Sequence, residues 1–248
     1  MIKAVIFDLD GTLVQTERLK ARSYARAVAD LCPRSLSEDL VIEAYKDLVG
    51  VSRQVMAQSL VDRFDLEGNL SEAMDRSGVG TPWQAFVQLR MGHYREMLSD
   101  PETLLQFTCP YAMGLLTTTR ERGLLTGLAT MSHCPEAMRV MDILGIRDLF
   151  DFVATVDDVA TPKPDPEIYL LVASELGQAP SECLVIEDSA SGVQAATAAK
   201  MHCIVVTTGY TRKGVHDQSL LPNRWILDDA RALGTAAEAM LKEQGAGD

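Results

Sequence analysis

Residues 4–13 read AVIFDLDGTL, and this segment indicates the fold class of the chain. Its first four residues are apolar, and two of them are β-branched, which favours a short strand buried on both faces. The run ends abruptly at Asp8, Asp10 and Gly11, a pattern typical of a turn that follows a buried parallel strand. We therefore expect a parallel sheet whose first strand delivers two carboxylates to its carboxyl end.

Strand and helix patterns alternate over most of the remaining chain. Apolar runs of the same form predict strands at residues 124–130, 152–156, 183–186, 203–207 and 225–227. Apolar residues at helical spacing predict helices at residues 111–122, 136–144, 167–176, 193–200 and 230–242. Because strands that alternate with helices form right-handed βαβ units, we expect an α/β fold with a doubly wound, Rossmann-like parallel sheet.

One interval breaks this alternation. Between the first and second strands the sequence shows only helical patterns, at residues 19–31, 40–49, 55–64, 71–77 and 83–98. Such an interval is too long for a simple crossover, so we interpret it as an inserted α-helical domain. We expect this domain to span residues 15–93 and an α/β core to comprise residues 1–14 and 94–248. The linkers are expected at residues 13–16 and 90–93.

Length and charge restrict the function. A chain of 248 residues can bury a core without disulfides or a structural metal. Its net charge of −12 argues against nucleic-acid binding, and it means that a phosphate site needs a local cluster of donors. Five cysteines without a CxxC pair indicate reduced thiols and a cytoplasmic protein. No apolar run is long enough to predict a membrane partner, and no pattern indicates the oligomeric state.

The residues with the chemistry follow the predicted strands. Ligands of open parallel sheets bind beyond the carboxyl ends of the strands. The polar residues expected at that edge are Asp8, Asp10, Thr130, Lys163, Glu187 and Asp188. Four carboxylates brought together repel one another unless a cation lies among them, and Mg²⁺ is the usual hard cation beside phosphates. Lys163, between two prolines, can neutralise a phosphoryl oxygen, and Thr130 can donate a hydrogen bond to another.

Asp8 and Asp10 lie two residues apart on a chain expected to be extended. Their side chains should therefore point to the same side. One carboxylate can then attack the substrate while the other moves protons.

Taken in order, these residues resemble the four motifs of the haloacid dehalogenase superfamily. The matching segments are DLDGTL at residues 8–13, Thr130, KPDPEIY at residues 163–169 and IEDSASGV at residues 186–193. The resemblance covers essentially the whole α/β core. It implies that Asp8 is a nucleophile that forms an aspartyl-phosphate. It implies that Asp10 is the general acid for the leaving group and then the base for water.

The same resemblance implies the binding residues. Thr130 and Lys163 would hold the phosphoryl group, and we add the neighbouring Met131 to this phosphate-binding set. Mg²⁺ would be bound by Asp8, by the main-chain carbonyl of Asp10, by Asp188, and by Glu187 either directly or through water. The superfamily's dehalogenases lack the second aspartate, so the presence of Asp10 disfavours dehalogenation.

The predicted helical insertion resembles the type-one cap of this superfamily, which closes over the site and selects substrates. Residues 50–53, GVSR, resemble a loop of β-phosphoglucomutase and related sugar phosphatases in which the arginine contacts a second phosphate. We therefore regard Arg53 as a candidate substrate residue, together with Lys20 and with Arg90, which a loose alignment places at a mutase lysine.

Two departures weaken the mutase reading. Lys20 stands where mutases carry a histidine, and His133-Cys134 stand where they carry Lys-Asn. The sequence therefore predicts a Mg²⁺-dependent phosphatase of a small phosphorylated metabolite, a sugar or polyol phosphate. The alternative is a β-phosphoglucomutase-type isomerase that returns the phosphoryl group to a sugar. A noncatalytic binding protein is disfavoured because Asp8, Asp10 and Lys163 are all present.

Overall fold

The computed structural model describes residues 1–32, 36–49 and 51–245. The chain divides into two compact units. The first consists of Met1–Gln15 with Leu104–Asp248, and the second consists of Thr16–Thr103. Each unit is described by itself below.

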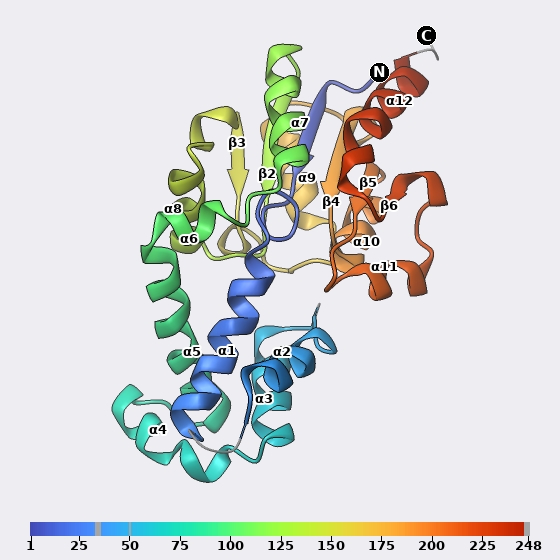
Figure 1. The fold of residues 1–248 in the computed structure, drawn as a ribbon. Helices are drawn as coiled ribbons and strands as arrows, with labels where there is room; N and C mark the ends of the chain where they lie inside the picture. Colours follow the sequence, from blue (N-terminus) through green and yellow to red (C-terminus); the bar gives the residue numbers. More distant parts are fainter. Residues whose placement is uncertain (33–35, 50, 246–248) are drawn as a thin grey trace. The chain divides into compact units, whose positions relative to one another are not determined.

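A parallel sheet forms the centre of the first unit (Figure 1). Within the described residues it has six strands in the order β3-β2-β1-β4-β5-β6, and every neighbouring pair is parallel. The strands are β1 (Ala4–Phe7), β2 (Leu125–Ala129), β3 (Phe152–Ala154), β4 (Cys183–Glu187), β5 (His202–Val206) and β6 (Ile226–Leu227). The predicted α/β fold is confirmed, and the strand that opens the chain lies in the interior of the sheet between β2 and β4.

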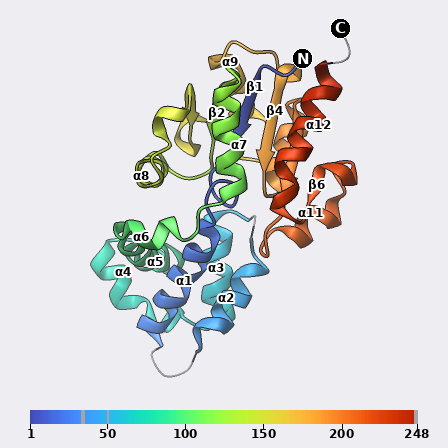
Figure 2. The same cartoon turned by 45° about the horizontal axis from the view of Figure 1, so that its top comes forward.

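Helices cover both faces of this sheet (Figures 1 and 2). On one face α7 (Pro110–Glu121) packs beside α12 (Leu233–Gly245), and on the other α9 (Glu167–Glu175) packs beside α10 (Ala190–Ala198). The remaining helices of this unit are α8 (Cys134–Leu144) and α11 (Arg212–Gln218). Ala4 and Ile6 of β1 belong to the apolar core beneath α9 and α10. Because side chains alternate along a strand, residues of β1 with even numbers face α9 and α10.

The packing of α9 on the sheet is close. A Cβ atom built on Gly127 of β2 would lie 2.4 Å from Cγ1 of Val172, a fully buried residue of α9. No residue larger than glycine fits there without a shift of the helix, because protein interiors are packed as densely as organic crystals. This contact fixes the height of α9 above the strands.

The second unit is helical. It contains α1 (Thr16–Leu31), α2 (Glu38–Lys46), α3 (Arg53–Arg63), α4 (Ser71–Ser77) and α5 (Pro82–Ser99). The short helix α6 (Pro101–Leu105) spans the boundary between the two units. The long helix α5 packs against α1, α3 and α4, and Tyr24 of α1 lies against Phe86 of α5 with ring centroids 5.5 Å apart. The predicted insertion of helices is therefore present. None of the helices in the described residues is both long and apolar enough to cross a membrane.

The predicted linker at residues 90–93 is wrong. These residues lie inside α5, because Arg90, Tyr94 and Leu98 recur at intervals of four and are all buried on the packed side of one continuous helix. The helix ends at Ser99, and the units divide between Thr103 and Leu104 rather than between residues 93 and 94.

Helix α6 is absent from the predicted elements, although the sequence carries a signal for it. The Asp100 side chain accepts hydrogen bonds from the Glu102 N–H and the Thr103 hydroxyl, and Pro101 occupies the first helical position. An aspartate followed by proline is a known helix start.

In the first unit, the segment that leads into the insertion is hydrogen-bonded to the segment that follows it. Val14 forms an antiparallel bridge with Thr108. The Gln15 N–H donates to the Phe107 carbonyl at 2.8 Å, and the Cys109 N–H donates to the Leu13 carbonyl at 2.9 Å. These two segments, far apart in the sequence, are therefore hydrogen-bonded neighbours.

Asp151, just before β3, ties α7 to β2. Its carboxylate accepts hydrogen bonds from the Thr126 N–H at 2.8 Å and from the Arg120 guanidinium at 2.7 Å. Burial alone would raise the pKa of the Asp151 carboxyl, but the Thr126 N–H and the Arg120 charge outweigh it and lower that pKa. A carboxyl whose pKa is lowered by folding stabilises the fold above its unfolded pKa and loses that effect in acid.

We therefore expect Asp151→Asn to lower the free energy of unfolding by about 1 kcal/mol at pH 7. The difference from the wild type should shrink as the pH falls through and below the lowered pKa of Asp151. Urea unfolding of both proteins between pH 7 and pH 3 measures this. A difference that stays constant across that range would contradict the assigned role of the carboxylate charge.

Candidate active site

Asp8 and Glu187 lie side by side at the carboxyl ends of β1 and β4. The two strands pair with Phe7 opposite Ile186, and the Asp8 N–H donates to the Ile186 carbonyl at 3.0 Å. Asp8 continues the even-numbered face of β1, and Glu187 continues the face of β4 that carries Cys183 and Val185 in the same core. Strand register therefore brings both carboxyl groups to the face covered by α9.

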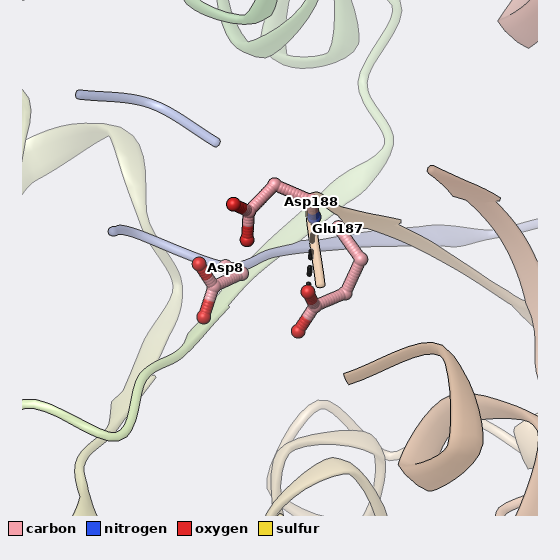
Figure 3. Close-up of side chains that lie close together, drawn as sticks. All are labelled: Asp8, Glu187 and Asp188. Carbon is pink, nitrogen blue, oxygen red and sulfur yellow. Dashed lines mark hydrogen bonds between the residues drawn. The ribbon is translucent and has the colours of Figure 1, made fainter. Parts of the chain in front are cut away.

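Asp188 completes a buried acidic group (Figure 3). In the described part of the chain, Asp8, Glu187 and Asp188 each offer one carboxylate oxygen, and these three oxygens lie within 4.8 Å of one another. Each residue is at most 6% exposed. Figure 3 shows the Asp188 side chain directed away from that of Glu187. Hard divalent cations such as Mg²⁺ prefer oxygen ligands of this kind. The donor set therefore fits the predicted metal.

Gly11 lies directly against Asp188. Its φ of +98° is outside the range that other residues adopt readily, and a Cβ atom at this position would lie 2.1 Å from Oδ2 of Asp188. The turn after β1 thus needs glycine for both its backbone conformation and its close approach to the carboxylate.

We expect Gly11→Ala to cost about 1–2 kcal/mol of stability through backbone strain. Because it also displaces Asp188, it should raise the Mg²⁺ concentration needed for half-maximal activity. Gly145→Ala is the matched control, since Gly145 has a φ of +65° but no atom within 4 Å of a built Cβ. The control should lose stability, but its Mg²⁺ concentration for half-maximal activity should stay unchanged. Equal metal dependence in the two variants would contradict the proposed contact with Asp188.

Lys163 is buried among three oxygen acceptors. Its Nζ donates to Oδ1 of Asp8 at 2.8 Å, to Oε1 of Glu187 at 2.7 Å and to the carbonyl of Ala129 at 2.9 Å. A lysine ammonium has three N–H donors, so all of them are used. The ammonium is thereby fixed beside Asp8, the first residue after β1.

Burial and neighbouring charges oppose each other in this site. The pKa of Asp8 is raised to about 7, because burial, aided by the charges of Glu187 and Asp10, outweighs the opposing charge of Lys163. Burial would also raise the pKa of Glu187, but Lys163 and the Tyr169 hydroxyl lower it overall. Burial would lower the pKa of Lys163, whereas the two carboxylates raise it overall. Glu187 is therefore the ionised partner of Lys163, and a further cation near Asp8 would favour its ionised form.

Asp10 lies beside the residues that follow β2. Its Oδ2 accepts hydrogen bonds from the Ser132 hydroxyl at 2.5 Å and from the Thr130 hydroxyl at 3.4 Å. Thr130 is fully buried, and its hydroxyl oxygen also accepts a hydrogen bond from the Ser132 N–H at 3.1 Å. The structure thus brings Asp10 and Thr130 together. It also adds Ser132, which the sequence patterns did not single out although it stands only two residues after Thr130.

Met131 has a different contact from its neighbours. Its sulfur accepts a hydrogen bond from the main-chain N–H of Lys163 at 3.3 Å, and its side chain packs against the apolar core. The side chain therefore supports the Lys163 loop.

The candidate substrate residues of the insertion all lie in the helical unit. Lys20 in α1 donates to Oε1 of Glu17 at 2.8 Å, and Arg53 is the exposed first residue of α3. Arg90 is only 5% exposed, and its guanidinium lies over the Tyr24 ring at 5.0 Å and the Tyr94 ring at 5.4 Å. Nε and Nη1 of Arg90 have no hydrogen-bond partner within the described residues. Gly50 of the predicted GVSR loop lies outside the described residues.

The chain is similar to a known family of hydrolases and to a phosphatase. Residues 2–200 match the haloacid dehalogenase-like hydrolase family. Hexitol phosphatase B of Escherichia coli (strain K12) is 30% identical over 208 residues, which cover 83% of this chain and 83% of that protein.

Two solved structures are also similar. A mutant of CbbY from Rhodobacter sphaeroides, in complex with xylulose-(1,5)bisphosphate, matches with a TM-score of 0.63 and 26% identity, covering 86% of this chain and 89% of that one. A Thermotoga maritima protein proposed to be a β-phosphoglucomutase matches with a TM-score of 0.64 and 26% identity, covering 95% of this chain and 91% of that one. The chain therefore belongs to the haloacid dehalogenase-like hydrolases.

Proposed function

We propose that this hydrolase is a Mg²⁺-dependent phosphatase that cleaves a small phosphomonoester, a sugar or polyol phosphate, through an aspartyl-phosphate on Asp8. The observation that carries the proposal is the Lys163 ammonium, 2.8 Å from Oδ1 of Asp8 inside a buried acidic group. A positive charge fixed beside a carboxylate at a strand end suits a phosphoryl group bound there.

In the first step an oxygen of Asp8 forms a bond to phosphorus while the bond from phosphorus to the leaving oxygen breaks. Asp10 donates its proton to that oxygen, so an alcohol leaves. In the second step Asp10 takes a proton from water, the water oxygen bonds to phosphorus, and the bond between phosphorus and Asp8 breaks. Ser132 and Thr130 hold Asp10 by hydrogen bonds, and Lys163 neutralises charge on the phosphoryl oxygens.

Asp8, Asp188 and the main-chain carbonyl of Asp10 would hold Mg²⁺, which supplies Lewis-acid stabilisation of the phosphoryl charge. Glu187 would contact the metal through water. Its two oxygens already accept five hydrogen bonds, from Lys163, Tyr169, the Asp188 N–H, and the N–H and hydroxyl of Ser189. A carboxylate offers about four lone pairs, so a direct bond to the metal would displace a donor.

Sugar or polyol phosphates are proposed because hexitol phosphatase B is a relative and the CbbY structure contains a sugar bisphosphate. Arg53, Lys20 and Arg90 are proposed to select the substrate, a role that rests on the sequence resemblance. A cap function of the helical unit has the same basis, and phosphate binding by Met131 is proposed because it follows Thr130 directly. The cytoplasmic location and the exclusion of nucleic acid remain predictions.

The alternative is a β-phosphoglucomutase-type isomerase. It is favoured by the similarity to the Thermotoga maritima structure. It is disfavoured by His133, which stands where the mutases carry a lysine. Nδ1 of His133 is hydrogen-bonded to Oδ1 of Asp157 at 2.6 Å. Such an enzyme would return the phosphoryl group to a sugar and would need a bisphosphate activator.

A panel of phosphate esters at fixed Mg²⁺ tests the proposal. It should include hexitol phosphates, phosphoglycolate, and β-glucose 1-phosphate with and without a bisphosphate. Release of inorganic phosphate from sugar or polyol esters is the expected result. Formation of an isomerised sugar phosphate, with little free phosphate, would favour the mutase instead.

A further inference from the structure

Tyr169 contacts two residues of the candidate active site, Glu187 and Lys163. It belongs to α9 and is fully buried, and its hydroxyl donates to Oε1 of Glu187 at 2.7 Å. The same oxygen accepts the hydrogen bond from Lys163 at 2.7 Å. One carboxylate oxygen is therefore shared between a phenol and an ammonium, and Tyr169 contributes to where that oxygen lies.

The aromatic ring of Tyr169 provides a second contact. Nζ of Lys163 lies 4.8 Å from the ring centroid, which is within the range of a cation–π interaction. The ammonium is thus bounded by the ring and by its three acceptors, on Asp8, Ala129 and Glu187. A lysine side chain is flexible and has many rotamers, so its position depends on such neighbours.

The surroundings fix Tyr169 itself. It lies one turn before Val172, which packs over Gly127 in β2, so the helix that carries it is seated on the sheet. The opposite oxygen of Glu187 accepts hydrogen bonds from the Asp188 N–H at 3.0 Å and from the Ser189 N–H at 3.1 Å. With one oxygen held by β4 and its turn and the other by Tyr169, the carboxylate of Glu187 has one defined orientation.

We infer that Tyr169 is a positioning residue for Lys163, acting through its hydroxyl on Glu187 and through its ring beneath the ammonium. It touches neither substrate nor metal in this role. The inference rests on the proposed phosphatase function, in which Lys163 must stand at the phosphoryl group on Asp8. A displacement of the ammonium by a fraction of an ångström then weakens the stabilisation of the transition state while leaving substrate binding almost unchanged.

The test measures kcat and KM for p-nitrophenyl phosphate at saturating Mg²⁺ in the full-length protein. Tyr169→Phe keeps the ring and removes the hydroxyl, and we expect kcat to fall roughly tenfold. Tyr169→Leu removes both contacts, and we expect a fall of roughly a hundredfold, so phenylalanine should rescue part of the loss. KM and the Mg²⁺ concentration for half-maximal activity should stay within about twofold of the wild type in Tyr169→Phe.

Val140→Ala in α8 is the matched control, because Val140 is only 2% exposed and the change removes buried apolar contacts without altering α9 or a polar group. It should lower the melting temperature at least as much as Tyr169→Phe and leave kcat near the wild-type value. An unchanged kcat in Tyr169→Phe would overturn the inference. So would an equal loss of kcat in Val140→Ala, or a change in Tyr169→Phe confined to the metal requirement.

The outcome also separates this inference from the function on which it rests. If wild-type protein hydrolyses p-nitrophenyl phosphate and Asp8→Asn does not, the phosphatase proposal stands whatever Tyr169→Phe does. If wild-type protein shows no hydrolysis, the phosphatase proposal fails, and the inference about Tyr169 fails with it.

Discussion

Asp8→Asn is expected to abolish phosphatase turnover, with a loss of kcat of about 10⁴-fold or more, because the amide oxygen cannot serve as the nucleophile. The fold should remain intact. Asparagine has nearly the same shape, and Lys163 keeps its hydrogen bonds to Glu187 and to the Ala129 carbonyl. Phosphate release by purified protein measures the effect, and appreciable residual activity would remove the covalent mechanism.

The stability of this variant gives an independent check. The pKa of Asp8 is raised to about 7 in the fold, so ionised Asp8 destabilises the metal-free protein above its unfolded pKa. The asparagine side chain of Asp8→Asn cannot ionise, and the variant should therefore be at least as stable as the wild type at pH 8 in the absence of metal. Asp75→Asn, an exposed change in α4, should alter neither activity nor stability.

Removal of Mg²⁺ is the second change with a large expected effect. Treatment with EDTA should reduce hydrolysis to the background rate, and added Mg²⁺ should restore it, because the buried carboxylates need a cation to hold a dianionic phosphate. Full activity in the presence of EDTA would contradict the proposed role of the acidic group.

Metal binding can also be measured without turnover. Since a ligand of the folded state raises stability with its concentration, Mg²⁺ should raise the melting temperature of the wild-type protein. Asp188→Asn should weaken this rise, because it removes one carboxylate of the group. An identical rise in the two proteins would place the cation elsewhere.

Most of the sheet could be predicted because its strands are short, apolar and bounded by turns. The buried run at residues 4–7 is exposed on neither face, and the sequence alone predicts its limits. Helix α11 escapes prediction for the opposite reason. Among its residues only Val215 is buried, and Gly214 interrupts it, so it has no apolar stripe to detect. The linker predicted at residues 90–93 is wrong because these residues lie inside the helix that the sequence predicts at residues 83–98, whose apolar pattern continues past them to Leu98.

The sequence predicts those residues of the candidate site that lie in motifs or directly after predicted strands. Asp8, Asp10, Lys163 and Asp188 follow from residue type and position. Tyr169 is the last residue of the KPDPEIY motif, but the sequence assigns it no role, because its partner Glu187 lies 18 residues further along the chain. Such a contact depends on how far a helix is turned about its axis, which spacing alone does not determine.

The bridge between Val14 and Thr108 has a consequence for how the protein could change over evolutionary time. The insertion leaves and rejoins the α/β unit through adjacent, hydrogen-bonded segments, so its two ends can be joined by a tight turn. Because the two ends of the insertion are hydrogen-bonded to each other, the sheet can accept insertions of different size at this place without loss of strand register. Under the proposed role of the insertion in substrate selection, exchange of this one unit would change the specificity of the hydrolase while the strands of the sheet stay as they are.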